Sequence, residues 1–128
     1  MQPTARLFIS LGSANAALAI MLGAFGAHGL KSRVTPQMLE VYHTAAQYHF
    51  YHAIGMLLVG VLATQMQSTG ALRLSGFLML AGIVLFSGSL YLLSISGITW
   101  LGAITPLGGL AFIAAWIVLA IAALRVRA

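Results

Sequence analysis

The chain has 128 residues, of which 61% are hydrophobic and only 5% are charged, and its mean hydropathy is +1.02. A soluble protein of this composition would have almost nothing polar to face water, which excludes a water-soluble domain and makes lipid the expected solvent. The formal charge of +5 comes from six basic residues near the ends of apolar stretches, which excludes a nucleic-acid-binding stripe, and no cysteine is present.

Four long apolar stretches predict an all-α fold, a four-helix transmembrane bundle that forms a single integral membrane domain over residues 1–128. The expected helices lie at about residues 7–30, 36–67, 72–95 and 101–124. A window of about 18 or more apolar residues matches the roughly 30 Å hydrocarbon core of a bilayer. The first stretch is long and is followed by polar chain, so we expect a retained helix and not a cleaved signal peptide.

The first expected helix carries small residues at a spacing of four. Gly12 and Ala16 form one row, and Gly23 belongs to a second. Such rows allow neighbouring helix backbones to approach closely in lipid. Asn15 lies near the middle of this helix, where an unsatisfied amide costs free energy. We therefore expect Asn15 to form an interhelical hydrogen bond, with a ligand contact as the alternative.

The second expected helix has an extended, partly amphipathic start. Thr35 and Pro36 are typical of an N-cap followed by a first-turn proline. A helix from there to residue 67 would be roughly 48 Å long at 1.5 Å per residue, which is too long for one crossing. We therefore expect its first turns, residues 37–47, to lie outside the hydrocarbon or along its surface.

Small residues suited to close packing also occur in the last two expected helices: Gly82, Gly108 and Gly109. A second Thr-Pro pair, Thr105 and Pro106, favours a helix that begins there, with residues 97–104 as an irregular segment. A proline kink inside a longer helix is the alternative.

Basic residues predict the orientation in the membrane. The side that holds both expected termini carries Arg6, Arg73, Arg125 and Arg127. The opposite side carries Lys31 and Arg33, partly offset by Glu40. Because cytoplasmic segments have an excess of Lys and Arg, we expect cytoplasmic termini.

Polar side chains gather near the junction of the first two helices, where all four histidines lie between His28 and His52. At 100° per residue, one arc of about 100° on the second helix forms a polar face. Its members are Glu40, His43, Thr44, Gln47 and Tyr51. His49 points nearly opposite to this face, so one helix alone does not bring the histidines together.

Several chemistries suit this cluster, and the cofactor stays open. Zinc and similar ions take three or four ligands, so a metal site requires His28 to meet His49 or His52, with Glu40 or His43 completing the shell. Two facing histidines would suit haem, although no haem attachment sequence is present. The simpler interpretation is hydrogen bonding among these side chains, water and lipid phosphate at headgroup depth.

No complete catalytic set is visible. Asp is absent and no Gly-x-Ser-x-Gly elbow occurs, so a serine hydrolase triad would depend on Glu40 alone. The glycine-rich stretches 23–29 and 102–109 lack the strand, lysine and acidic partners of a nucleotide-binding loop. We therefore expect a protein that is not an enzyme.

Four motifs follow one another along the chain. They are Gly-Ala-Phe-Gly-Ala-His-Gly-Leu at 23–30, Tyr-His-x-x-His-Ala within 47–53, Phe-Ser-Gly-Ser-Leu-Tyr-Leu at 86–92, and Thr-Pro-Leu-Gly-Gly-Leu-Ala-Phe-Ile-Ala-Ala-Trp at 105–116. With them the chain resembles a family of small inner-membrane proteins of unknown function that also includes eukaryotic transmembrane protein 256. The resemblance implies a four-helix, multi-pass protein of the bacterial inner membrane and no assigned reaction, substrate or cofactor.

The same motifs supply candidates for a shared site: His28, Tyr48, His52, Ser87, Ser89, Tyr91, Thr105 and Pro106. One departure is that the family pattern usually reads Tyr-Gln ahead of the His-Ala pair, whereas Gln47 and Tyr48 are reversed here. The ends of helices 1 and 3 and the starts of helices 2 and 4 share one side. We therefore expect His28, His52, Tyr91 and Thr105 to converge.

The candidate binding cluster is His28, Glu40, His43, Gln47, Tyr48, His49, His52, Tyr91 and Thr105. The leading hypothesis is a noncatalytic membrane component that binds a lipid headgroup, a hydrophobic cofactor or a partner protein. Its expected partners are membrane lipids and either further copies of itself or another membrane protein, but no nucleic acid. The alternatives are a small-molecule or proton-linked transporter, suggested by Asn15, and a metal- or haem-binding subunit that uses His28 and His52.

Overall fold

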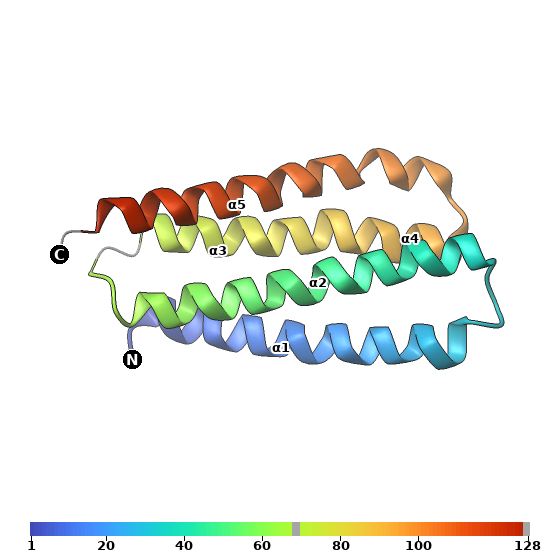
Figure 1. The fold of residues 1–128 in the computed structure, drawn as a ribbon, viewed down its shortest axis with the longest axis horizontal. Helices are drawn as coiled ribbons and strands as arrows, with labels where there is room; N and C mark the ends of the chain where they lie inside the picture. Colours follow the sequence, from blue (N-terminus) through green and yellow to red (C-terminus); the bar gives the residue numbers. More distant parts are fainter. Residues whose placement is uncertain (68–69, 127–128) are drawn as a thin grey trace.

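The computed structural model describes residues 1–67 and 70–126, and over these residues the chain is helical with no strand. Its long helical rods lie side by side and alternate in direction (Figure 1). In chain order the elements are α1 (Pro3–Phe25) with a π-helical turn (Gly26–Leu30), α2 (Pro36–Ala63), α3 (Gly70–Gly82), a second π-helical turn (Ile83–Ser87), α4 (Gly88–Ser96), a 3-10 turn (Thr99–Ala103) and α5 (Thr105–Arg125).

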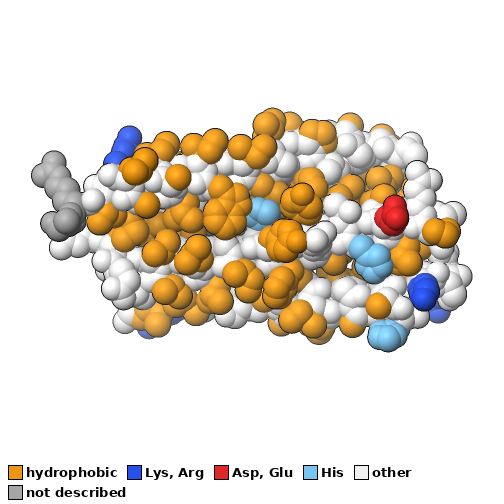
Figure 2. Space-filling model, in the orientation of Figure 1, with side chains coloured by type: hydrophobic (Ala, Val, Ile, Leu, Met, Phe, Trp, Pro, Cys, Tyr) orange, Lys and Arg blue, Asp and Glu red, His pale blue; other side chains and the backbone are white. Residues whose placement is uncertain are grey.

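Three of the rods are long and apolar enough to cross a bilayer: Pro3–Leu30, Gly70–Ser96 and Thr99–Arg125. The all-helical fold is therefore confirmed, together with three helices capable of spanning a membrane. α2 is not among these three, and it carries most of the Gln, His and Tyr residues of the candidate binding cluster. Hydrophobic side chains cover the length of the bundle, and Lys and Arg side chains lie at its two ends (Figure 2).

α2 is the central element. It packs along α1 on one side and against α3 and α4 on another, while α5 packs on α3 and on the π-helical turn Ile83–Ser87. The side chains that it buries include Tyr42, His49, His52 and Met56. The polar residues of α2 therefore divide between an inner face and an outer face.

Glycines permit the closest helix contacts. A Cβ at Gly12 would lie 2.6 Å from the backbone nitrogen of Leu57, and a Cβ at Gly60 would lie 2.7 Å from that of Ile9. The backbones of α1 and α2 therefore touch, as small-residue packing in lipid requires.

The other expected packing residues behave differently from one another. A Cβ at Gly108 would collide with the Phe86 backbone, and one at Gly82 would collide with the Phe112 ring. Gly109 would make only an ordinary contact, at 3.8 Å from Phe86, and Ala16 is half-buried. A Cβ at Gly23 would meet nothing within 4 Å, so this residue does not mark a close approach.

α2 begins at the residue that the sequence predicted, but it ends earlier than predicted. The Thr35 hydroxyl oxygen accepts a hydrogen bond from the Met38 backbone nitrogen at 3.2 Å, and Pro36 occupies the first turn. The helix ends at Ala63 and not near residue 67. The reason is local, because the Thr64 hydroxyl donates to the Val61 carbonyl at 2.6 Å and the chain leaves the helix in a turn.

α5 begins at Thr105, but Thr105 does not cap it. The helix has no side-chain cap, and the Thr105 hydroxyl is hydrogen-bonded to Ser89 instead. The expected irregular segment before it is also wrong in part, because Thr99–Ala103 forms a 3-10 turn. Gly97, with φ of 73°, ends α4 in the left-handed conformation that glycine adopts without strain.

The start of α1 and the end of α5 lie at one end of the bundle (Figure 1). At this end Arg73 Nη1 donates to Thr4 Oγ1 at 3.1 Å, which ties α3 to the start of α1. Lys31 and Arg33 lie in the link between α1 and α2 at the opposite end. Arg127, which the charge comparison counted, lies outside the described residues.

Candidate functional site

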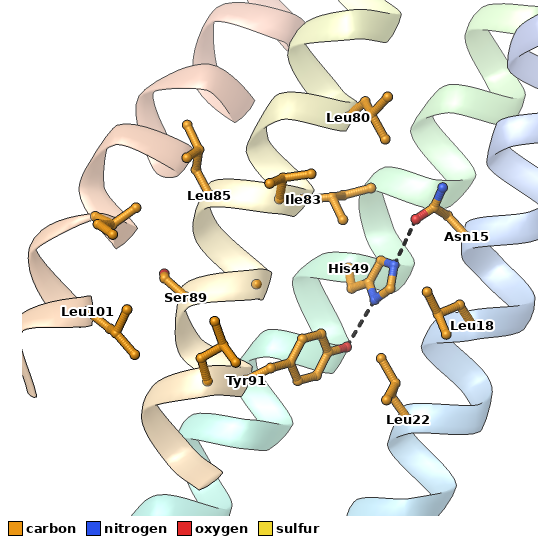
Figure 3. A pocket seen from close by; sticks show the side chains of 14 residues that line it. Asn15, Leu18, Leu22, His49, Leu80, Ile83, Leu85, Ser89, Tyr91 and Leu101 are labelled. Carbon is orange, nitrogen blue, oxygen red and sulfur yellow. Dashed lines mark hydrogen bonds between the residues drawn. The ribbon is translucent and has the colours of Figure 1, made fainter. Parts of the chain in front are cut away.

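A pocket of about 510 Å³ lies beside the α3–α4 rod (Figure 3). Its walls come from α1, from α2, from this rod and from the 3-10 turn before α5. The lining is leucine, isoleucine, valine and glycine apart from four polar residues: Asn15, His49, Ser89 and Tyr91. An apolar hollow with a few polar groups on its wall is the usual form of a small-molecule site.

The pocket opens on the outer surface of the bundle. Leu18 is 43% exposed, Val84 is 62% exposed and Leu92 is 58% exposed, and these residues form its apolar rim. His49 and Ser89 are buried and form its inner wall. The rim therefore belongs to two of the rods that are long and apolar enough to cross a bilayer.

A hydrogen-bond chain crosses the inner wall, as the dashed lines in Figure 3 show. Asn15 Nδ2 donates to the Leu11 carbonyl at 2.9 Å, which leaves its Oδ1 to face His49 Nε2 at 3.0 Å. His49 must therefore carry its proton on Nε2 and accept on Nδ1, where the Tyr91 hydroxyl donates at 3.0 Å. Both hydrogen bonds are therefore donated in the same direction, from Tyr91 to His49 and from His49 to Asn15.

These hydrogen bonds join α1, α2 and α4. Asn15 thus makes an interhelical hydrogen bond, as its depth in the helix predicted. Two polar groups at the ends of this set of hydrogen bonds remain unused. They are the second amide proton of Asn15 and a lone pair on the Tyr91 oxygen. Each of these atoms can meet one small polar group of a bound molecule, but not the same group, because the His49 ring lies between them.

Tyr42 packs against the Tyr91 end of these hydrogen bonds, although the candidate binding cluster omitted it. Its hydroxyl donates to the Leu22 carbonyl at 2.6 Å, and its ring meets the Tyr91 ring edge-on with centroids 5.1 Å apart. Gly26 leaves room for this ring, since a Cβ there would lie 2.5 Å from a Tyr42 ring carbon. The signal was available, because Tyr42 and His49 are seven residues apart and so share one helix face.

His52 forms a separate polar centre on the next turns of α2. Trp116 Nε1 donates to its Nε2 at 3.0 Å, so the His52 proton is on Nδ1, which donates to the Tyr48 carbonyl at 2.7 Å. The imidazole stacks on Phe112 with centroids 3.5 Å apart and planes 10° apart. Both ring nitrogens are occupied within the chain, so His52 acts as a packing residue between α2 and α5.

The expected convergence of His28, His52, Tyr91 and Thr105 is wrong. Gly12 packs on Ala53, so His28, sixteen residues further along the same rod, lies roughly 24 Å from the level of His52. Tyr91 instead pairs with His49, and Thr105 with Ser89 at 2.6 Å. Over residues 1–67 and 70–126, no three His, Cys, Asp or Glu side chains are grouped to hold a metal ion.

The remaining candidates lie at the surface or in the second π-helical turn. Exposed residues are His28, Glu40, His43, Gln47, Tyr48 and Pro106. Gln47 Nε2 donates to the Tyr51 hydroxyl at 2.6 Å on the outer face of α2. The Ser87 hydroxyl is buried without a hydrogen-bond partner among the described residues.

Known proteins resemble this chain over nearly its whole length. A membrane protein of Bacillus subtilis strain 168, UPF0382 membrane protein YwdK, is 54% identical over 120 residues, which cover 94% of this chain and 98% of that protein. UPF0382 membrane protein SERP0230 of Staphylococcus epidermidis is 42% identical, with 94% and 97% covered. UPF0382 membrane protein SAUSA300_0565 of Staphylococcus aureus is 44% identical with the same coverage.

No solved structure matches the chain. A family model matches residues 22–109, which include three of the four motifs in full, the start of the fourth and most of the residues described above. The curated relatives carry the name of membrane proteins, in agreement with the three apolar rods. By the family model and by these identities, the chain belongs to the family described as Protein of unknown function (DUF423).

Proposed function

We propose that the protein is a noncatalytic membrane component that binds the hydrophobic chain of a membrane molecule, an acyl or isoprenoid chain carrying one small polar group. The pocket beside α4 carries this proposal. Its rim is apolar and exposed, and the polar atoms of Asn15 and Tyr91 lie on its inner wall. A wholly polar ligand would leave most of this lining unsatisfied, whereas a hydrocarbon chain matches it.

The proposed setting is the bacterial inner membrane, with α2 as a fourth crossing and the termini in the cytoplasm. α2 runs beside α1 along the bundle (Figure 1), and burial against α1, α3 and α4 shields the polar residues of its inner face from lipid. The end that holds Arg6, Arg73 and Arg125 carries more positive charge than the end that holds Lys31 and Arg33. The kinship with eukaryotic transmembrane protein 256 stays a prediction from the motifs.

Binding is favoured over the alternatives because few polar side chains line the pocket. Four polar residues line it, and the rest of its lining is apolar. A transport path needs polar groups along the membrane normal. A metal or haem site on His28 and His52 would need two residues that lie at different levels of the bundle.

Photolabelling tests the proposal. The protein is placed in phosphatidylcholine nanodiscs with a phosphatidylglycerol that carries a diazirine in its acyl chain, or with a diazirine-bearing isoprenoid alcohol, and labelled residues are mapped by mass spectrometry. We expect labelling of residues 80–92 that saturates and is displaced by the unlabelled molecule. Both probes carry a hydrocarbon chain and differ in the molecule that bears it. Saturation by only one probe therefore identifies whether a phospholipid or an isoprenoid alcohol is bound.

Gly88→Leu provides the pocket-filling variant. A Cβ at Gly88 would make only an ordinary contact, 3.8 Å from the Ile83 carbonyl, so the leucine enters the pocket without displacing a helix. Gly23→Leu is the matched control, since it makes the same change at an open site that is not in the pocket lining. Loss of saturable labelling in Gly88→Leu alone is expected. Non-saturable labelling of the wild type, or equal labelling in both variants, overturns the proposal.

A further inference from the structure

A continuous stripe of exposed side chains follows the outer face of α2. Its members, here called the outer stripe, are Glu40, His43, Gln47, Tyr51, Ile54, Leu58 and Val61. They are spaced by three or four residues, so they stand above one another on one side of the helix. His49 points away from the outer stripe into the pocket wall, so the two surfaces are separate.

The polar part of the outer stripe reaches the middle of the helix. α2 has 28 residues and is therefore about 42 Å long, whereas hydrocarbon is about 30 Å thick. Gln47 and Tyr51 lie within about 4 Å of its midpoint at 1.5 Å per residue. With α2 crossing as proposed, Gln47 lies inside the hydrocarbon, contrary to the expectation that residues 37–47 lie outside it. The hydrogen bond between Gln47 and Tyr51 then faces outward at a depth where lipid offers no polar partner.

Polar atoms exposed at this depth favour a protein neighbour. Tyr51 is 50% exposed and accepts from Gln47, so its own hydroxyl proton and the Gln47 amide oxygen take no part in that bond. A hydroxyl or amide group facing hydrocarbon without a hydrogen bond costs free energy, and interhelical hydrogen bonds relieve this cost. Each molecule therefore presents an unused donor, the Tyr51 hydroxyl, beside an unused acceptor, the Gln47 amide oxygen.

We infer that the outer stripe is the interface of a parallel two-fold homodimer, in which the Tyr51 hydroxyl of each copy donates to the Gln47 amide oxygen of the other. A two-fold axis along the membrane normal sets each residue opposite the same level of the second copy, so one donor and one acceptor satisfy each other twice. Glu40 and His43 repeat the pattern one to two turns away, since a carboxylate accepts from an imidazole N–H.

A second copy suits the rest of the outer stripe as well. Beyond Tyr51 the stripe continues as Ile54, Leu58 and Val61, which are 43%, 42% and 47% exposed. These apolar side chains can pack against their own counterparts, while the polar half specifies register and orientation. The inference rests on α2 crossing the membrane and is independent of the pocket ligand.

Single cysteines test the interface cleanly because the chain has none of its own. Ile54→Cys lies on the outer stripe, and Ile113→Cys is the matched control, an isoleucine that is 58% exposed on α5. After oxidation with copper phenanthroline in native membranes, a non-reducing gel is expected to show a disulfide-linked dimer for Ile54→Cys and monomer for Ile113→Cys. Monomer in both variants, or dimer in both to the same extent, overturns the inference.

Removal of the polar pair provides a second, quantitative test. In the Ile54→Cys background, Gln47→Leu with Tyr51→Phe is expected to weaken dimerisation about tenfold, in keeping with two lost interhelical hydrogen bonds. Native mass spectrometry of the wild-type protein is expected to show a mass of two chains. An unchanged dimerisation constant in the double variant, or a complex with a different protein in place of the second copy, overturns the inference.

Discussion

The inner and outer faces of α2 use the same residue types for different purposes. On the inner face, Tyr42, His49 and His52 each have a hydrogen-bond partner within the chain. On the outer face, Gln47 and Tyr51 are exposed and bond only along their own helix. The difference shows that polar residues of one helix can divide between those that pack the chain on itself and those that face outward.

The largest effect is expected where the inner face meets α1. Gly60→Leu places a side chain 2.7 Å from the Ile9 nitrogen, and the two backbones must separate. We expect the free energy of unfolding to fall by about 3 kcal/mol, measured by SDS titration in mixed micelles. Gly23→Leu, at an open position, should change it by less than about 0.5 kcal/mol. Equal losses in both variants would contradict close packing at Gly60.

The second prediction concerns the partner of His52. His52→Phe keeps a ring against Phe112 but removes the acceptor of the Trp116 indole N–H. The free energy of unfolding should fall by about 1–2 kcal/mol. In a Trp100→Phe background, the fluorescence emission of Trp116 should shift to shorter wavelength as its hydrogen bond is lost. Emission identical to that of the unsubstituted background would argue against this bond.

The third prediction tests whether the hydrogen-bond chain acts as a unit. Tyr91→Phe and Asn15→Leu each remove one partner of His49 and should each cost about 0.6–1.7 kcal/mol. Because both act through one imidazole, the double variant should lose measurably more or less than the sum. Ser75→Ala, which removes a separate bond to the Ala115 carbonyl, should add independently to Tyr91→Phe. Simple additivity of Tyr91→Phe and Asn15→Leu would mean that the two bonds are uncoupled.

The smallest effect on folding is expected on the outer face. Gln47→Leu should change the free energy of unfolding of the monomer by less than about 0.5 kcal/mol, since the side chain is exposed. The measurement is made in excess detergent, where copies are separated. A loss as large as that of Tyr91→Phe would show that the outer stripe contributes to the fold of a single chain, and the contrast between the two faces would disappear.

Local features of the sequence were sufficient to predict the rods and some of their ends. Apolar runs predicted long helices, and Thr35 with Pro36 predicted the start of α2, because both signals depend on nearby residues. Asn15 was predicted to bond another helix because an amide deep in an apolar helix needs a partner. Local reasoning did not predict that the partner is His49, since this depends on which faces of two distant segments meet.

The π-helical turn at Ile83–Ser87 shows why the site was harder to predict than the rods. Such a turn inserts one residue into the helix and rotates everything after it by about 100°. Tyr91 therefore reaches His49 while Ser89 reaches Thr105, a division that uniform helical spacing does not reveal. The expected meeting of Tyr91 and Thr105 with His28 and His52 assumed an uninterrupted helix and a common level in the bundle.

By itself, the sequence determined that this is a helical membrane protein, because the length and apolarity of each segment settle its free energy of transfer into lipid independently of its neighbours. Tertiary structure alone decided that His49 joins α1 to α4, that His52 packs on α5, and that Gln47 and Tyr51 face outward. The physical reason is rotational. Apolarity drives a helix into lipid at almost any angle about its axis, whereas that angle is chosen by contacts such as Gly12 on Leu57 and Gly108 on Phe86.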